Sequence, residues 1–276
     1  MVMSVNTNTG AQIALQNLNA TNAALSVTQN RINTGKSVAT AKDNGSIWAI
    51  AQGQRADIGA LGAVKQSLDR GIAAVDVALA AGETVSDLLL QLKEKALAAK
   101  DASLTTSARA ALNEDFKALR DQIATVTANA DFNGVNLLKT GATGFQALAN
   151  VTGSANLTVG GEVLALGSTN VTIASTMQID TLTKATTALT AVNTSIDRVS
   201  GALARLGTKS KALSTHLTFV GKLSDALEAG VGNLVDADLA KESAKLQALQ
   251  TKQQLGVQAL GIANQTPQLV LSLFRS

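Results

Sequence analysis

An apolar residue recurs at every seventh position over a long stretch of the second half of the chain. The series is Ala185, Val192, Val199, Leu206, Leu213, Val220, Leu227 and Leu234. A companion series that starts at Leu182 is apolar at most of its positions. Paired apolar series sustained over eight heptads are typical of a coiled-coil helix. The pattern predicts one helix over roughly residues 182–234.

Helical spacing of apolar residues also marks the first half of the chain. One stripe repeats every seven residues from Ala11 to Ile32. A second series runs from Ile47 to about Ala102, which predicts a helix of about fifty residues, far longer than a typical globular helix. A third series reaches Ala130, and its helix is expected to begin near Thr105 or Ser107. The first half is therefore predicted to be helical.

The final helix is expected to follow two candidate N-cap carboxylates, Asp236 and Asp238. Its apolar stripe consists of Leu239, Leu246, Leu249, Val257 and Leu260. The stripe runs until Pro267, and an apolar tail follows it.

A segment rich in Gly, Thr, Ser and Asn separates the two helical halves. The sequence Phe132-Asn133-Gly134-Val135 carries an Asn-Gly hairpin signal. A second hairpin is predicted between residues 157–159 and 163–166, with Gly160-Gly161 as its turn, and residues 171–173 could add a strand. The expected fold is mainly α: a long antiparallel helical hairpin with a small β-rich insert at its tip and both termini together at one end.

Charged residues are distributed unevenly along the chain. Residues 1–30 and 253–274 contain none, and residues 140–179 contain only Glu162. Chain termini normally lie in solvent, where charged residues are favoured. We therefore expect the uncharged ends to be buried together against other molecules.

Composition excludes several classes of protein. The chain has no Cys and one His, so it cannot form a disulfide framework, a zinc–thiolate site or a two-histidine metal site. Six aromatic residues among 276 suit slender helices better than a globular core. Net charge is +3 without a basic run, and no stretch is long enough to span a membrane. We expect no cofactor, no nucleic-acid partner, no membrane partner and no cleavable export signal.

Three features could suggest an enzyme, and a structural interpretation is preferred for each. Gly35-Lys36-Ser37 lacks the leading glycine of a phosphate-binding loop, so it is predicted to connect the first two helices. His216 falls beside a core position of the heptad array and is expected to be a partly solvated interhelical residue. Glu114 and Asp115 are adjacent on a helix and diverge. No catalytic residue is assigned.

The hydroxyl groups of the insert are expected to face solvent. O-linked sugar on them is a secondary hypothesis. The candidate positions are Thr143, Thr152, Ser154, Ser168, Thr169 and Thr172.

Several segments in both halves resemble bacterial flagellin, the subunit of the flagellar filament. They are Asn6-Thr7-Asn8, Ile32-Asn33-Thr34-Gly35, Ala41-Lys42-Asp43-Asn44, residues 132–138, Asp236-Ala237-Asp238 and residues 263–275. The resemblance covers about residues 1–139 and 182–276. The short insert resembles the compact flagellins of alphaproteobacteria such as the Caulobacter group.

The resemblance implies a division into five parts. Residues 1–35 and 236–276 form the N- and C-terminal helices of an inner tube. Residues 36–139, which include the Phe-Asn-Gly hairpin, and residues 182–235 form the two halves of an outer-tube helical domain. Residues 140–181 form a short variable surface insert.

The resemblance also implies a life history for the chain. It leaves the cell unfolded through the flagellar type III export apparatus, is bound beforehand by a cytoplasmic export chaperone, and polymerises with copies of itself outside the cell. A filament cap and hook–filament junction proteins are the other expected partners. Gln91 stands where flagellins sensed by the Toll-like receptor carry Arg, so weak receptor activation is expected.

Assembly is expected to bury apolar residues of the terminal helices against neighbouring subunits. The candidate interface residues are Leu18, Leu25, Ile32, Leu246, Leu249, Leu260 and Leu273. Two alternatives remain open from the sequence alone. One is a hook–filament junction protein, and the other is a secreted adhesin that displays the insert on a coiled-coil stalk.

Overall fold

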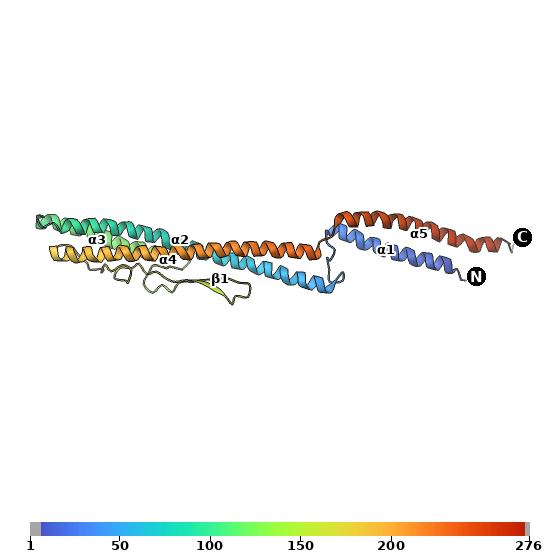
Figure 1. Cartoon of the computed structure of the whole chain (residues 1–276), viewed down its shortest axis with the longest axis horizontal. Coiled ribbons are helices and arrows are strands. Elements are labelled where there is room, and N and C mark those ends of the chain that lie inside the picture. Colours follow the sequence, from blue (N-terminus) through green and yellow to red (C-terminus); the bar gives the residue numbers. More distant parts are fainter. Residues whose placement is uncertain (1–6, 274–276) are drawn as a thin grey trace. The chain divides into compact units, whose positions relative to one another are not determined.

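The computed structural model describes residues 7–273, with side chains described for residues 7–265. Within this range the chain forms five helices and one two-stranded antiparallel sheet (Figure 1). The elements are α1 (Thr9–Thr34), α2 (Gly45–Ala99), α3 (Thr106–Asn129), β1 (Phe145–Leu148), β2 (Asn156–Val159), α4 (Leu182–Val235) and α5 (Leu239–Leu273). The chain divides into two compact units, residues 57–225 and residues 1–56 together with 226–276.

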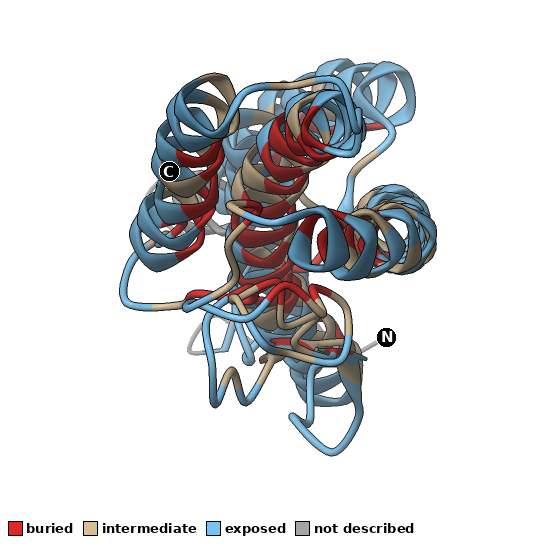
Figure 2. Ribbon diagram, turned by 90° about the vertical axis from the view of Figure 1, so that its left-hand side faces the viewer, coloured by how far each residue is buried: buried red, intermediate tan, exposed pale blue. Residues whose placement is uncertain are grey.

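The heptad helix predicted over residues 182–234 is confirmed as α4. Within residues 57–225, every member of the series from Ala185 to Val220 is at most 1% exposed. Figure 2 shows such buried residues confined to one side of each helix. At the two ends of α4 the pattern weakens, because Leu182 and Leu234 are 44% and 36% exposed. Burial of the stripe explains why a sequence with few aromatic residues forms so long a helix.

Helix α2 packs closely against α4 inside the unit of residues 57–225. Gly82 permits this approach, because a Cβ atom at that position would collide with the side chain of Leu203 on α4. Gly71 likewise admits the ring of Phe145 from β1, whose Cε1 lies 2.6 Å from the position that a Cβ would take. The apolar series predicted for α2 is buried where it meets these partners, as at Leu68, Val75 and Leu89.

Helix α3 begins where the sequence placed its start and holds the end of the insert. The hydroxyl of Thr105 accepts a hydrogen bond from the N–H of Ala108 at 3.2 Å, which caps the helix. Buried Asn113 accepts from the N–H of Ile179 at 2.7 Å, and Arg120 donates to the carbonyl of Met177 at 2.8 Å. These side chains fix residues 177–179 just before α4 begins.

The predicted Asn-Gly turn is confirmed. Asn133 and Gly134 both have positive φ, 52° and 83°, which is the conformation of a type I′ turn. Phe132 and Val135 exchange backbone hydrogen bonds of 2.9 and 3.0 Å across it. The turn returns the chain onto α3, where buried Asn136 donates to the carbonyls of Thr127 and Ala128 and accepts from two backbone N–H groups.

The second predicted hairpin is wrong. Residues 156–159 do form a strand, but they pair with residues 145–148 across a seven-residue loop, in the register Phe145↔Val159. Residues 163–166 and 171–173 are not strands. Their backbone groups find other partners, since the N–H of Leu164 bonds to the carbonyl of Leu138 and the N–H of Thr172 to the hydroxyl of Ser195. Period-two patterning alone cannot foresee such partners.

The predicted apolar stripe stops at Pro267, but α5 continues through this residue to Leu273. A proline inside a helix removes the N–H that would bond to the carbonyl four residues earlier, here that of Ala263. The side-chain Nδ2 of Asn8 donates to this carbonyl at 2.7 Å instead. A donor from α1 thus compensates for the hydrogen bond that the proline removes.

We expect the substitution Asn136→Asp to lower the free energy of unfolding by about 2–3 kcal/mol. The carboxylate loses both donated bonds and places an acceptor against two helix carbonyls in a buried site. Urea unfolding of the purified chain measures the change. Asn193→Asp on the exposed face of α4 is the matched control and should change stability by less than about 0.5 kcal/mol. Equal effects of the two substitutions would contradict this account of Asn136.

Candidate assembly surface on the terminal helices

Helices α1 and α5 lie side by side and run in opposite directions (Figure 1). Asn8, before α1, contacts Ala263 near the far end of α5. In the middle, Gln253 donates to Asn22 at 2.8 Å. At the other end Arg31 forms an ion pair with Glu242 at 3.0 Å. The expectation that the two ends of the chain lie together is thereby confirmed.

Two connecting segments join the helical pair to α2 and α4 and hydrogen-bond to each other. Gly35 ends α1 in the left-handed conformation with φ of 67°, and its carbonyl accepts from the N–H of Ala237 at 2.9 Å. The N–H of Ser37 bonds to the carbonyl of Val235 at 2.7 Å. Gly35-Lys36-Ser37 is therefore a connector, as predicted, and it does not lead from a strand into a helix as a phosphate-binding loop does.

The start of α5 is capped by one of the two predicted carboxylates. Asp238 accepts from the N–H of Lys241 at 3.0 Å. Asp236 lies outside the helix and its backbone pairs with Lys36 in an isolated bridge. Asp238 is thus the N-cap, and Asp236 belongs to the connector.

A seam of buried and half-buried residues joins α1 to α5 at alternating steps of three and four. On α1 it consists of Ala11, Ala14, Leu18, Thr21, Leu25, Thr28 and Ile32. On α5 it consists of Glu242, Leu246, Leu249, Gln253, Gly256, Leu260 and Ala263. The approach is close at Leu18, whose Cδ1 lies 3.3 Å from the position that a Cβ on Gly256 would take. Six of the seven candidate interface residues lie in this seam, and the side chain of the seventh, Leu273, lies outside the described residues.

Polar atoms interrupt the seam near its connector end. Thr28 is fully buried and Glu242 is 8% exposed, although neither residue type is favoured in a core. The Thr28 hydroxyl, Arg31 Nε and Glu242 Oε2 have no hydrogen-bond partner among the described residues. Glu242 was not predicted as a seam residue, although it lies seven residues before Leu249 and therefore on the same face of the helix.

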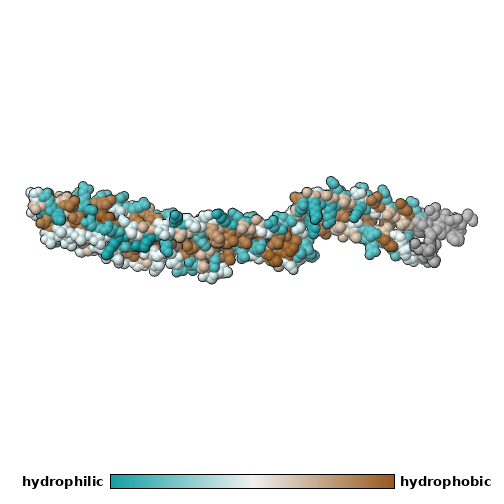
Figure 3. All heavy atoms as spheres, in the orientation of Figure 1, coloured by the Kyte–Doolittle hydropathy of each residue, from teal (hydrophilic) through white to brown (hydrophobic). Residues whose placement is uncertain are grey.

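A second set of large apolar side chains on the same helices remains exposed. They include Ile13, Leu15 and Val27 on α1 and Leu239, Leu255 and Val257 on α5, each between 44% and 59% exposed. Figure 3 shows apolar residues at the surface of this pair. Leu239 and Val257 were predicted to belong to the buried stripe, but both are exposed. The buried stripe instead consists of Leu246, Leu249, Gln253, Gly256 and Leu260.

The candidate glycosylation sites divide into two groups. Thr143, Thr152, Ser154 and Thr169 are exposed. Ser168 and Thr172 are half-buried, and their hydroxyls donate to the carbonyls of Val163 and Ala191. The hydroxyls of the second pair therefore support the backbone of the insert.

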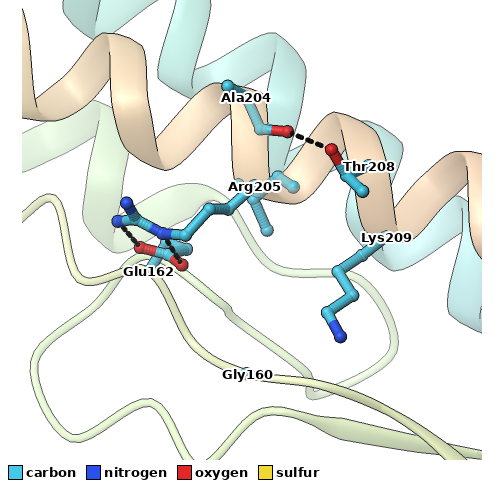
Figure 4. A pocket seen from close by; sticks show the side chains of 7 residues that line it. Gly160, Glu162, Ala204, Arg205, Thr208 and Lys209 are labelled. Atoms are coloured by element: carbon cyan, nitrogen blue, oxygen red, sulfur yellow. Dashed lines mark hydrogen bonds and ion pairs between the residues drawn. The ribbon is translucent and has the colours of Figure 1, made fainter.

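A hollow of about 420 Å³ beside α4 is lined by charged side chains. Figure 4 shows Glu162 and Arg205 facing each other in it, with both guanidinium contacts at 2.6–2.7 Å. The hydrogen bond to Glu162 raises the pKa of Arg205, and the two side chains satisfy each other's hydrogen-bonding groups. The arrangement holds the insert against α4 and provides no acid–base pair for catalysis.

His216 is half-buried, as the predicted partial solvation requires, but the contact that it makes is with the insert and not with another helix. Its Nε2 lies 2.8 Å from the carbonyl of Ala149, just beyond β1, and its ring lies 5.7 Å from that of Phe219. His216 therefore contacts the insert. Glu114 and Asp115 diverge as predicted, toward Lys117 and Lys95 respectively.

None of the helices within residues 7–273 combines the length and the hydropathy that a membrane crossing requires. Across the same residues no cluster of His, Asp and Glu has the grouping that would hold a metal ion.

Comparison with known proteins places the chain in one family. The family model of the bacterial flagellin N-terminal helical region matches residues 5–143, and that of the C-terminal helical region matches residues 189–274. Flagellin FljM of Caulobacter vibrioides is 57% identical over 99% of this chain and 98% of its own length. Flagellin of Brucella melitensis is 38% identical over 99% of both chains.

Solved structures agree on the fold. Bacillus cereus flagellin matches 56% of this chain and 88% of its own with a TM-score of 0.50 at 19% identity. A putative flagellar hook-associated protein from Vibrio parahaemolyticus matches 70% of this chain and all of its own with a TM-score of 0.58 at 12% identity. The two family-model matches and the relatives that are similar over nearly the full length show that the chain belongs to the bacterial flagellins, the structural subunits of the extracellular flagellar filament.

Proposed function

We propose that the chain builds the filament by packing the outer faces of the α1–α5 pair against the same pairs of neighbouring subunits. The observation that carries this proposal is the row of exposed apolar side chains on both helices, from Ile13 to Val257. Full burial of an exposed side chain of this size contributes about 1.5–3 kcal/mol, and because these side chains are already about half buried, each contributes roughly half of that. The absence of charged residues from 1–30 and 253–274 means that this burial desolvates no ionised side chain in these stretches.

The candidate residues of the seam have a separate role in this proposal. They hold α1 and α5 together, and the paired helices then present the exposed apolar side chains to neighbouring subunits. These seam residues are Leu18, Leu25, Ile32, Leu246, Leu249 and Leu260. Residues 1–35 and 236–276 form the inner tube, residues 36–139 and 182–235 the outer tube, and residues 140–181 the surface insert. Contacts between copies are heterologous and do not close, so a helical polymer grows.

Export and capping complete the proposal. The chain passes unfolded through the flagellar export apparatus after release from a cytoplasmic chaperone, and it polymerises beneath a filament cap on a base of hook–filament junction proteins. Long helices with local hydrogen bonds suit this route, because local contacts form quickly when the chain emerges. The α1–α5 pair has a further requirement, since its partners are more than 200 residues apart in sequence.

We expect Val257→Asp and Leu255→Asp each to prevent polymerisation while leaving the α1–α5 pair intact. A carboxylate in a surface that neighbouring subunits bury carries a large desolvation cost. Electron microscopy and sedimentation of the purified protein after seeding measure the polymer. Substitutions to Asn at the same positions are matched controls and should weaken assembly less than the charged ones.

Charge in the seam should act differently. Leu249→Asp places a carboxylate between α1 and α5, where the wild-type side chain is 9% exposed, and should separate the helices as well as abolish assembly. Circular dichroism of the unassembled variants, compared with unassembled wild type, distinguishes the two kinds, because only Leu249→Asp should lose helix signal. Normal filaments from Val257→Asp would contradict the outward surface, and normal filaments from Leu249→Asp would contradict the seam.

We propose that O-linked sugar, as an elaboration of the insert, is carried on Thr143, Thr152, Ser154 and Thr169, where the hydroxyls are exposed. The intact mass of filament protein from its native host should exceed the sequence mass. Replacing these four residues by Ala should remove the excess, whereas Ser168→Ala and Thr172→Ala should leave it. A mass equal to that of the unmodified chain would refute the assignment.

A further inference from the structure

The single proline of the chain frees one helix carbonyl at a defined place. Pro267 lies inside α5, which continues to Leu273. Because proline has no N–H, the carbonyl of Ala263 lacks its usual donor four residues later. An unpaired backbone acceptor in a half-buried seam position is costly, so it calls for another donor.

Asn8 supplies that donor from the opposite end of the chain. Its Nδ2 donates to the Ala263 carbonyl at 2.7 Å. Its Oδ1 accepts from the N–H of Ala11 at 3.0 Å and caps α1. One carboxamide therefore satisfies a donor that is orphaned at the start of α1 and an acceptor that is orphaned by the proline of α5.

On α1 the residues around this contact are small. A Cβ on Gly10 would lie 3.5 Å from Asn8 Oδ1 and 4.0 Å from the Cβ of Ala263. Ala11 and Ala14 are the nearest seam residues on α1. Small side chains let a short Asn reach α5, but they bury little apolar area. Among the described residues of α1, those near Asn8 therefore contribute less apolar burial than Leu18 and Leu25.

The opposite end of the pair is already fastened. The connectors exchange backbone hydrogen bonds, such as that from Ala237 to Gly35, and Arg31 pairs with Glu242. The end at Asn8 has no such link between connectors within the described residues, since both helices there lead toward the chain termini.

We propose that Asn8 and Pro267 form a clasp that closes the open end of the α1–α5 pair. The proline makes the Ala263 carbonyl available, and Asn8 binds it while capping α1. Fraying of the start of α1 and of the last turns of α5 is therefore coupled, and the ordered pair that assembles into the filament depends on both residues. Asn8 acts as a positioning residue, because it holds the helices that make contact with neighbouring subunits.

The substitution Asn8→Asp removes the hydrogen bond to the Ala263 carbonyl while keeping the one that caps α1. Aspartate keeps the oxygen that caps Ala11 but has no side-chain N–H for Ala263. We expect amide exchange, followed by mass spectrometry on assembled filaments, to become about fivefold faster in peptides from residues 9–18 and 256–273. Peptides from residues 25–34 and 239–249 should keep their wild-type rates. Asn19→Asp, at an exposed position on α1, adds the same charge without this contact and should leave both regions unchanged.

Pro267→Ala provides the decisive background. Alanine restores the N–H that bonds to the Ala263 carbonyl within α5, so the Asn8 donor has less to contribute. In this background Asn8→Asp should accelerate exchange in residues 256–273 by less than about twofold. A second measurement covers any variant that assembles poorly. It compares the critical concentration for growth on wild-type filament seeds among the wild type, Asn8→Asp, Pro267→Ala and the variant that carries both substitutions.

The outcomes separate clearly. A large effect of Asn8→Asp in the wild-type background and a small one with Pro267→Ala support the clasp. Equal effects in the two backgrounds would overturn it, since Asn8 would then act independently of the proline. No effect of Asn8→Asp on residues 256–273 would overturn it as well, as would an equal effect of Asn19→Asp.

Discussion

Pairing of long helices through narrow apolar seams is the constraint on which the rest of the structure depends. A single helix of more than fifty residues cannot bury its own stripe, so α4 is stable only because Val192, Val199 and Leu206 are covered by other segments. Within residues 57–225, glycine at position 82 lets α2 provide that cover at short range. In the terminal unit, α1 and α5 cover each other. The two units therefore use one principle with different side chains.

The seams differ in what they can do because they differ in composition. The α4 stripe is almost wholly aliphatic and completely buried from Ala185 to Val220. The α1–α5 seam contains threonine, glutamine and glutamate, and it leaves half-exposed apolar residues on the outside. A seam of this second kind is less stable by itself and gains most from additional burial. That property suits a segment that is ordered by its neighbours in a polymer.

Sequence periodicity located the helices because apolar spacing and burial have the same physical cause. The bounds of α2, α3 and α4 and the Asn133-Gly134 turn followed from local patterns. The errors arose where a partner far away in sequence decides the outcome. Asn8 donates to the Ala263 carbonyl, which Pro267 leaves without its usual helical donor. Ser195 and Leu138 accept hydrogen bonds from backbone N–H groups that a second hairpin would have used. Apolar spacing located six of the seven candidate residues in the α1–α5 seam. The exposed apolar residues could not be assigned from spacing alone, because this requires knowing which face of each helix packs against the other helix.

The insert is tied to the helices at its borders and also between them, as by the ion pair of Glu162 with Arg205. Asn136 holds its entry to α3, and Asn113 and Arg120 hold its exit. The loop between β1 and β2 is closed by contacts of its own, including that from Asn150 to Ser154 at 2.8 Å. The strands beside this loop contact the helices, as at Phe145 and His216, but residues 151–154 within the loop are exposed. A foreign peptide inserted between Val151 and Ser154 would therefore be exposed on the subunit and would not enter the seams between paired helices.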